Sequence, residues 1–227
     1  MPKFAVIIYG PPGSGKSTQA ELVASAYGLV RFDTGKYIEE VINDPKNKKN
    51  KFIQKQKQRY ESGLLCDRPW VFSIVSSQIK KIIKAGFGLV LGGSPRTSFE
   101  AFDQEGRPGV YSILKKAYSK GGIFTFLLKV KPSSSIFRNK ERKICIVCGR
   151  QVVYDKKFKI TKCPFCSGSL RTRKDDKPEV IKARLVEFER ATKPIFEGLK
   201  KRGFKIHQIN GDQPPYKVFQ DIKKWLP

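Results

Sequence analysis

The sequence predicts an α/β fold in which five parallel strands form one sheet with helices on both of its faces. Short apolar runs alternate along the chain with segments of helical period, at residues 3–10, 28–32, 87–93, 122–130 and 203–209. The first run, KFAVIIYG, is β-branched and nearly continuous, which is typical of a parallel strand covered on both faces. Ligands of such a sheet bind at the carboxyl ends of its strands, so the residues after each run are the candidates for a site.

The first predicted strand ends in a phosphate-binding motif. Residues 10–18, GPPGSGKST, match G-x-x-x-x-G-K-S, and the segment that follows has apolar residues at helical spacing. Glycines let backbone N–H groups converge on phosphate oxygens, and the new helix adds its positive N-terminal end. We therefore expect a P-loop NTPase-type site for a nucleoside triphosphate, with Lys16 on the β- and γ-phosphates and Ser17 or Thr18 near Mg²⁺.

The composition is typical of a soluble globular protein. The 227 residues are 39% hydrophobic and 29% charged, and no apolar run has the length of a bilayer. The first residues run directly into the phosphate motif, so we expect no signal peptide and a cytoplasmic location. Lys and Arg number 46 against 20 Asp and Glu, and the formal charge of +26 attracts nucleic acid or nucleoside phosphates. A solvated lysine-rich surface accounts for much of this charge equally well.

Four of the five cysteines form a metal-ligand pattern. Cys145, Cys148, Cys163 and Cys166 are spaced C-x2-C-x14-C-x2-C, which can complete a tetrahedron of thiolates around Zn²⁺. Four thiolates leave no open coordination position, so the zinc would be structural, and a redox dithiol pair is the alternative. The remaining cysteine, Cys66, is expected to be a small buried hydrophobic side chain.

Several ordered motifs resemble the adenylate kinases and related nucleoside monophosphate kinases of the zinc-lid type. Besides the phosphate loop, DTG at 33–35 is similar to the start of their monophosphate-binding helices, and SGLLCD at 62–67 to their base-binding loop. GSPRT at 93–97 is similar to their G-F-P-R-T segment, and residues 171–195 to their lid-closing stretch. The resemblance implies reversible, Mg²⁺-dependent transfer of the γ-phosphoryl group of ATP to a nucleoside monophosphate, with AMP as the first choice, by a monomeric enzyme.

The resemblance also implies roles for residues at matching positions. The catalytic residues would be Lys16, Arg96, Arg142, Arg173 and Arg184. ATP would be bound by Gly13, Ser14, Gly15, Lys16, Ser17, Thr18, Arg138, Arg142 and Gln213. The acceptor would be bound by Thr34, Gly35, Lys36, Gly63, Leu65, Asp67, Gly93, Arg96, Glu100, Arg173 and Arg184. These cations suit phosphoryl transfer, which needs two phosphate chains held in line and positive charge around the transferred group.

Three parts of the chain follow from the same resemblance. They are a core of residues 1–32, 68–140 and 177–227, a helical acceptor-binding insertion of residues 33–67, and a zinc-binding lid of residues 141–176. We expect both insertions to swing inward when substrates bind, because closure keeps water from the transferred group. The only histidine, His207, lies in a predicted strand and is expected to be structural.

Four positions depart from the family pattern. Glu39 replaces an arginine of the acceptor phosphate site, Gly92 a carboxylate on the magnesium side, and Ser94 a phenylalanine. Glu100 replaces the glutamine that recognises the adenine edge of AMP. Because a carboxylate cannot donate to a ring nitrogen, GMP, CMP or UMP stay open as alternative acceptors.

Nearby residues could compensate for these departures. Lys36 or Arg68 could supply the missing positive charge at the acceptor phosphate, and Asp33 the missing carboxylate. The last of these is a hypothesis that rests only on the predicted position of Asp33 at a strand end.

A protein of another class remains open as an alternative: a nucleotide-regulated zinc-ribbon protein that binds nucleic acid. The flanks of the cysteine pattern favour the lid, because Arg138 and Arg142 precede it and RTRKDD follows it. Its aromatic residues, Tyr154, Phe158 and Phe165, are expected to fill a small core under the metal rather than to stack on bases. The net charge would still allow weak, non-specific and salt-sensitive nucleic-acid binding.

Overall fold

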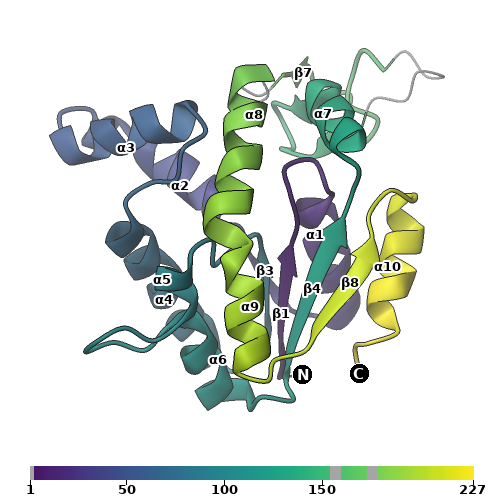
Figure 1. The fold of residues 1–227 in the computed structure, drawn as a ribbon. Helices are drawn as coiled ribbons and strands as arrows, with labels where there is room; N and C mark the ends of the chain where they lie inside the picture. The colour runs from purple at the N-terminus through teal and green to yellow at the C-terminus, as the bar shows by residue number, and fades with distance from the viewer. Residues whose placement is uncertain (1–2, 154–159, 173–177) are drawn as a thin grey trace.

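The computed structural model describes residues 3–153, 160–172 and 178–227. At its centre lies a five-stranded parallel sheet of order β2-β3-β1-β4-β8 (Figure 1). The strands are β1 (Ala5–Tyr9), β2 (Val30–Phe32), β3 (Leu89–Gly92), β4 (Ile123–Lys129) and β8 (Ile206–Asn210). Each strand falls on one of the five apolar runs, which confirms the predicted sheet.

Strand β1 lies in the middle of the sheet because its side chains are apolar on both faces. Ile7 pairs with Leu91 on one side and with Thr125 on the other. Alternate residues of β1 enter two separate cores: Ile7 joins the core under one layer of helices, and Ile8 joins the core under the other. The first layer contains α4 (Arg68–Lys84), α6 (Val110–Tyr118) and α9 (Pro194–Lys201), and the second α1 (Lys16–Tyr27) and α10 (Pro215–Lys223).

A helical segment projects from one side of the sheet after β2 (Figure 1). It consists of α2 (Thr34–Asn43), a 3-10 turn (Pro45–Asn47) and α3 (Lys51–Glu61). Side chains cap its helices: Asp33 accepts from Lys36 N and Asn50 from Ile53 N. The apolar face of the segment, including Ile38 and Ile53, packs onto the first core.

A second segment lies between α7 (Pro132–Lys140) and α8 (Pro178–Glu187) and forms a three-stranded antiparallel sheet. Its strands are β5 (Arg142–Cys145), β6 (Gln151–Val153) and β7 (Leu170–Arg171), with β5 in the middle. Cys145, Val152 and Cys163 form its own small core, with Ile160 and Leu170 packed against them. The remaining elements are α5 (Ser98–Ala101) and a π-helical turn (Phe188–Thr192).

The predicted role of Phe165 in this core is wrong. Its side chain is 61% exposed, and the guanidinium of Arg150 lies 4.7 Å from the centre of its ring. The sulfurs of Cys163 and Cys166 turn towards the other two cysteines, so the residues between them face outward. Tyr154 and Phe158 lie outside the described residues.

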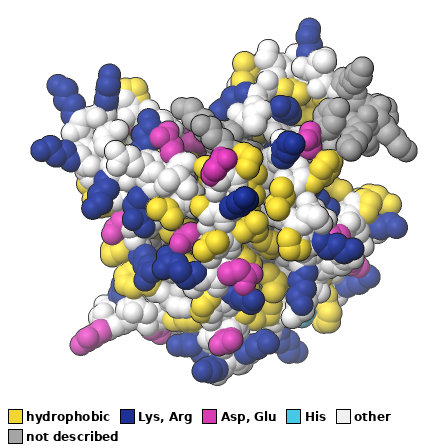
Figure 2. Space-filling view, turned by 45° about the horizontal axis from the view of Figure 1, so that its top comes forward, with side chains coloured by type: hydrophobic (Ala, Val, Ile, Leu, Met, Phe, Trp, Pro, Cys, Tyr) yellow, Lys and Arg dark blue, Asp and Glu magenta, His cyan; other side chains and the backbone are white. Residues whose placement is uncertain are grey.

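The face drawn in Figure 2 is rich in cations, which do not gather in one patch there. Figure 2 shows Lys and Arg side chains over the whole visible face, among Asp, Glu and apolar side chains. Within the described ranges, no helix combines the length and the apolar character needed to cross a bilayer.

Candidate active site

The loop between β1 and α1 has the backbone of a phosphate-binding loop. Gly13 and Gly15 have φ angles of 74° and 93°, a left-handed conformation that glycine adopts without strain. A Cβ on Gly13 would lie only 2.5 Å from Asn139 Nδ2, so α7 approaches the loop closely at this position. The hydroxyl of Ser135, also on α7, donates to Pro12 O at 2.5 Å and fastens the loop to the helix.

Lys16, the first residue of α1, is turned back onto this loop. Its Nζ donates to Gly10 O at 2.7 Å and to Pro11 O at 2.8 Å. Burial lowers the pKa of the Lys16 ammonium well below its usual value, and the positive charges of Arg184, Arg96 and Arg142 lower it further. Four cations from α1, the loop after β3, β5 and α8 therefore act on one region.

The structure holds Arg96 firmly in the loop after β3. Its Nε donates to Gly93 O at 3.0 Å, and its carbonyl accepts from the hydroxyl of Thr192 at 2.9 Å. Gly93 must remain small, because a Cβ there would lie 3.1 Å from the Lys16 side chain. The backbone of Arg96 thus lies between the phosphate loop and the π-helical turn.

A cleft joins many of the predicted residues. Its lining consists of Tyr9, Gly10, Pro12, Lys16, Gly63, Leu65, Gly93, Arg96, Arg184, Glu187, Phe188 and Thr192. Gly63 touches α8, since a Cβ on it would lie 3.1 Å from Arg184 Cγ. Four of these residues were not predicted individually: Tyr9, Glu187, Phe188 and Thr192. Tyr9 ends a strand immediately before the phosphate loop, and the other three lie within residues 171–195, which resemble the lid-closing stretch.

The loop after β8 lies against α7 on the side where the resemblance implies the adenine of ATP. Arg138 Nη1 donates to Gly211 O at 2.7 Å, and Lys131 N donates to Asp212 Oδ2 at 2.8 Å. A surface cavity of about 390 Å³ adjoins this loop and is lined in part by Lys131 and Asn210. The side chain of Gln213 turns towards α10 and donates to Asp221 Oδ2 at 2.6 Å.

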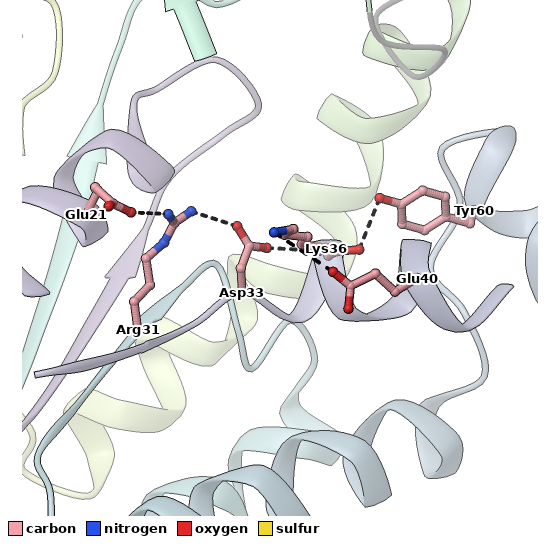
Figure 3. Close-up of polar contacts among 7 residues, drawn as sticks. Glu21, Arg31, Asp33, Lys36, Glu40 and Tyr60 are labelled. Carbon is pink, nitrogen blue, oxygen red and sulfur yellow. Dashed lines mark hydrogen bonds and ion pairs between the residues drawn. The ribbon is translucent and has the colours of Figure 1, made fainter. Parts of the chain in front are cut away.

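The first turn of α2 carries the predicted acceptor residues Thr34, Gly35 and Lys36 (Figure 3). The hydroxyl of Thr34 is buried, and within the part of the chain that is described it has no hydrogen-bond partner. The Lys36 side chain is 74% exposed, with its Nζ 3.9 Å from Glu40 Oε1. Figure 3 also shows Tyr60, whose hydroxyl donates to Gly35 O at 3.3 Å.

Asp67 and Glu100, the two acidic side chains predicted at the acceptor site, accept hydrogen bonds from neighbouring residues of the protein. The carboxylate of Asp67 accepts from Trp70 N at 3.0 Å and caps α4. Glu100, which is 2% exposed, accepts from Arg96 N at 3.1 Å and from the Thr97 hydroxyl at 2.8 Å. Burial raises the pKa of Glu100 above its usual value.

The four cysteines of the second segment form one cluster. All four sulfurs lie within 4.8 Å of one another, with 3.5 Å between Cys145 and Cys166 and 3.6 Å between Cys148 and Cys163. A tetrahedral zinc site with Zn–S bonds of about 2.3 Å has S···S edges of about 3.8 Å, so the cluster fits this metal. Backbone N–H groups of Cys148 and Val147 donate to Cys145 Sγ and lower its pKa to about 6. Cys66 is 7% exposed and apart from the cluster, as predicted.

Two further predicted residues, Arg142 and Arg173, flank the cysteine pattern in the sequence. Arg142 is the first residue of β5 and acts electrostatically on Lys16. Arg173 lies outside the described residues.

Comparisons with known proteins extend over the whole chain. Residues 9–97 match the family described as "AAA domain". A protein named "Adenylate kinase" from Lachnospira eligens is 31% identical over 97% of this chain and 99% of its own length. Proteins of the same name from Lactobacillus helveticus and Methanothrix thermoacetophila are 33% and 29% identical, over 96% and 97% of this chain and 95% and 97% of their own lengths. The likeness therefore includes the cysteine-containing segment and the C-terminal helices as well as the phosphate loop.

Proposed function

The chain belongs to the adenylate kinase family, and we propose that it transfers the γ-phosphoryl group of Mg²⁺-ATP reversibly to AMP, giving two molecules of ADP. The observation that carries this proposal is the cleft that Lys16 lines together with Arg96 and Arg184, with Arg142 acting electrostatically on the same ammonium. In the protein without ligand these four positive charges repel one another. The phosphates of two nucleotides would turn that repulsion into attraction, which is the electrostatic requirement of phosphoryl transfer.

On the donor side, the phosphate loop would hold the phosphates of ATP through its backbone N–H groups and the N-terminus of α1. The ammonium of Lys16 already lies against the loop, where it donates to the carbonyls of Gly10 and Pro11. When ATP binds, Lys16 would donate to phosphate oxygens in place of these carbonyls. The hydroxyls of Ser17 and Thr18 would meet the Mg²⁺ that arrives with ATP. Arg138, on α7, would lie beside the adenine, next to the loop that Gly211 begins.

On the acceptor side, Arg96 would hold the phosphate of AMP in a bidentate contact. Its bond to Gly93 O fixes the direction of the guanidinium before any substrate binds, so less entropy is lost on binding. The buried hydroxyl of Thr34, the residue before Gly35 in the first turn of α2, offers a further donor. Arg184 and Arg173 would reach the transferred group from the lid side.

The zinc-binding lid would be residues 141–176, and the acceptor-binding insertion residues 33–67. We propose that Cys145, Cys148, Cys163 and Cys166 hold a structural Zn²⁺, which supplies a cross-link to a segment whose own core is very small. A rigid lid would carry Arg142, at its entry, as one body during closure.

The identity of the acceptor is the part of the proposal that needs a direct test. Initial rates with AMP, GMP, CMP and UMP under saturating Mg²⁺-ATP should be highest with AMP. A higher rate with another nucleoside monophosphate would reject AMP as the acceptor and retain the kinase. The buried carboxylate of Glu100 motivates this second possibility, because it stands at the position where the family pattern has a glutamine.

A further inference from the structure

We propose that Tyr60 is a further acceptor-binding residue, whose hydroxyl donates a hydrogen bond to the phosphate of the nucleoside monophosphate. The inference rests on the proposed function, because it concerns the acceptor half of that site. It holds for any base, since the phosphate is common to all candidate acceptors.

The position of the Tyr60 hydroxyl is the first observation. Tyr60 lies near the end of α3, and its ring points to the first turn of α2 (Figure 3). A Cβ on Gly35 would lie 3.4 Å from Asp33 Oδ1, 3.8 Å from Arg96 Nη2 and 4.0 Å from Tyr60 Oη. The space that Gly35 leaves open is therefore bordered by the Asp33 carboxylate, the Arg96 guanidinium and the Tyr60 hydroxyl. The guanidinium is the proposed phosphate clamp, and the carboxylate is already bound to Arg31 and to Lys36 N.

The charges around this space are the second observation. Glu39 stands where the family pattern has a second arginine, and the Lys36 ammonium lies on an exposed side chain near Glu40. Of the three atoms nearest to a Cβ on Gly35, the cationic one is Arg96 Nη2. A phosphate has more acceptor sites than one guanidinium can fill, so a neutral hydroxyl at the same place has a ready partner.

The hydrogen bond between the Tyr60 hydroxyl and Gly35 O is long and easily exchanged. Its hydroxyl is 3.3 Å from Gly35 O, beyond the usual range for a hydrogen bond between two oxygens. Gly35 is the second residue of α2, where the helix itself supplies a donor to the carbonyl. Rotation of the hydroxyl towards a charged phosphate would replace a weak bond by a charge-assisted one and leave no buried group unsatisfied.

Tyr60→Phe tests the proposal, because it removes the hydroxyl and keeps the ring. Tyr118→Phe is the matched control: Tyr118 Oη also donates to a backbone carbonyl, Phe87 O at 2.6 Å, but from α6, outside the cleft. In Tyr60→Phe we expect the KM of the acceptor to rise at least about tenfold, with kcat and the KM of ATP unchanged. The control should leave both KM values at the wild-type level.

Calorimetry with AMP and with adenosine separates phosphate binding from a structural role. The variant should lose at least about tenfold in AMP affinity and retain its affinity for adenosine, which lacks the phosphate. An equal loss for both ligands, or an unchanged AMP affinity, would overturn the proposal. AMP binding by the wild-type chain without phosphoryl transfer would reject the proposed function alone, and the calorimetric comparison would still decide the role of Tyr60.

Discussion

Arg31 and Asp33 form an ion pair, with 2.8 Å between Arg31 Nη2 and Asp33 Oδ2 (Figure 3). The other oxygen of the same carboxylate accepts from Lys36 N at 3.1 Å and caps α2. Arg31 also pairs with Glu21 on α1. The carboxylate of Asp33 favours the charged form of Lys16, against the effect of the arginines. Asp33 therefore links β2, the first turn of the acceptor insertion and the phosphate loop.

Substitutions of Asp33 should separate its capping role from its charge. Asp33→Asn keeps a good N-cap and should lower the free energy of unfolding by less than Asp33→Ala, which loses the cap at a cost of about 1 kcal/mol. If the carboxylate helps to order Mg²⁺, both variants should need more Mg²⁺ for half-maximal activity. Urea unfolding and magnesium titrations check these two effects. Equal stability of the two variants would show that the cap contributes nothing.

Lys16→Met should abolish most of the activity without destabilising the protein. The kcat should fall by at least about 10²–10³, because the variant lacks a cation at the transferred group. The free energy of unfolding should stay the same or rise. Burial and the positive charges of three arginines both disfavour the charged form of Lys16 in the folded chain, and the variant removes this unfavourable charge. Lys80→Met, at an exposed position of α4, is the control and should change neither property. A clear loss of stability in Lys16→Met would contradict the electrostatic argument.

Replacing both Cys145 and Cys148 by Ser should remove the metal and loosen the lid. Zinc content, measured by mass spectrometry of the purified protein, should fall from about one ion per chain to near zero. The Tm should fall by about 2–4 °C for each kcal/mol lost. Cys66→Ser is the matched control, because its buried sulfur lies outside the cluster, and it should keep the zinc. Unchanged metal content in the double variant would reject the assignment of these ligands.

Glu100→Gln should change how stability depends on pH. Burial raises the pKa of Glu100 in the folded protein above its usual value of 4.5. Its contribution to stability is therefore complete below pH 4.5 and is lost as the pH rises through the folded pKa. The glutamine of the variant does not titrate, so the variant does not lose this stability as the pH rises. The free energy of unfolding of the variant minus that of the wild type should therefore be larger at pH 8 than at pH 4. Urea unfolding at both pH values provides the check, and a constant difference would contradict the shift.

Local sequence patterns were sufficient for much of the fold. The five apolar runs correspond to the five strands because a buried parallel strand requires apolar side chains on both of its faces. The phosphate loop was recognisable because its backbone requires glycine locally: Gly13 and Gly15 both have a positive φ. The cysteine cluster was recognisable because two short knuckles bring their own sulfurs together.

Side-chain direction was harder to predict. Phe165 was expected inside the small core, but the sulfurs on either side of it turn inward and force it to the surface. Glu100 was predicted at the acceptor base, and nothing in the sequence indicated that its oxygens accept from Arg96 N and from the Thr97 hydroxyl. Tyr60 had no local signal at all, because its relevance depends on how α3 packs against α2.

Sequence periodicity, glycine spacing and cysteine spacing were enough to identify the sheet, the phosphate loop and the cysteine cluster, since each depends on residues close together in the chain. Only the tertiary structure decided two further features of the site. The charges of Arg96, Arg142 and Arg184 act on Lys16, and the Tyr60 hydroxyl donates to Gly35 O. These residues come from separate elements, and the packing of those elements around β1 sets the distances between them. A charge or a hydroxyl acquires its partners only when that packing excludes water and brings remote segments within a few ångströms of one another.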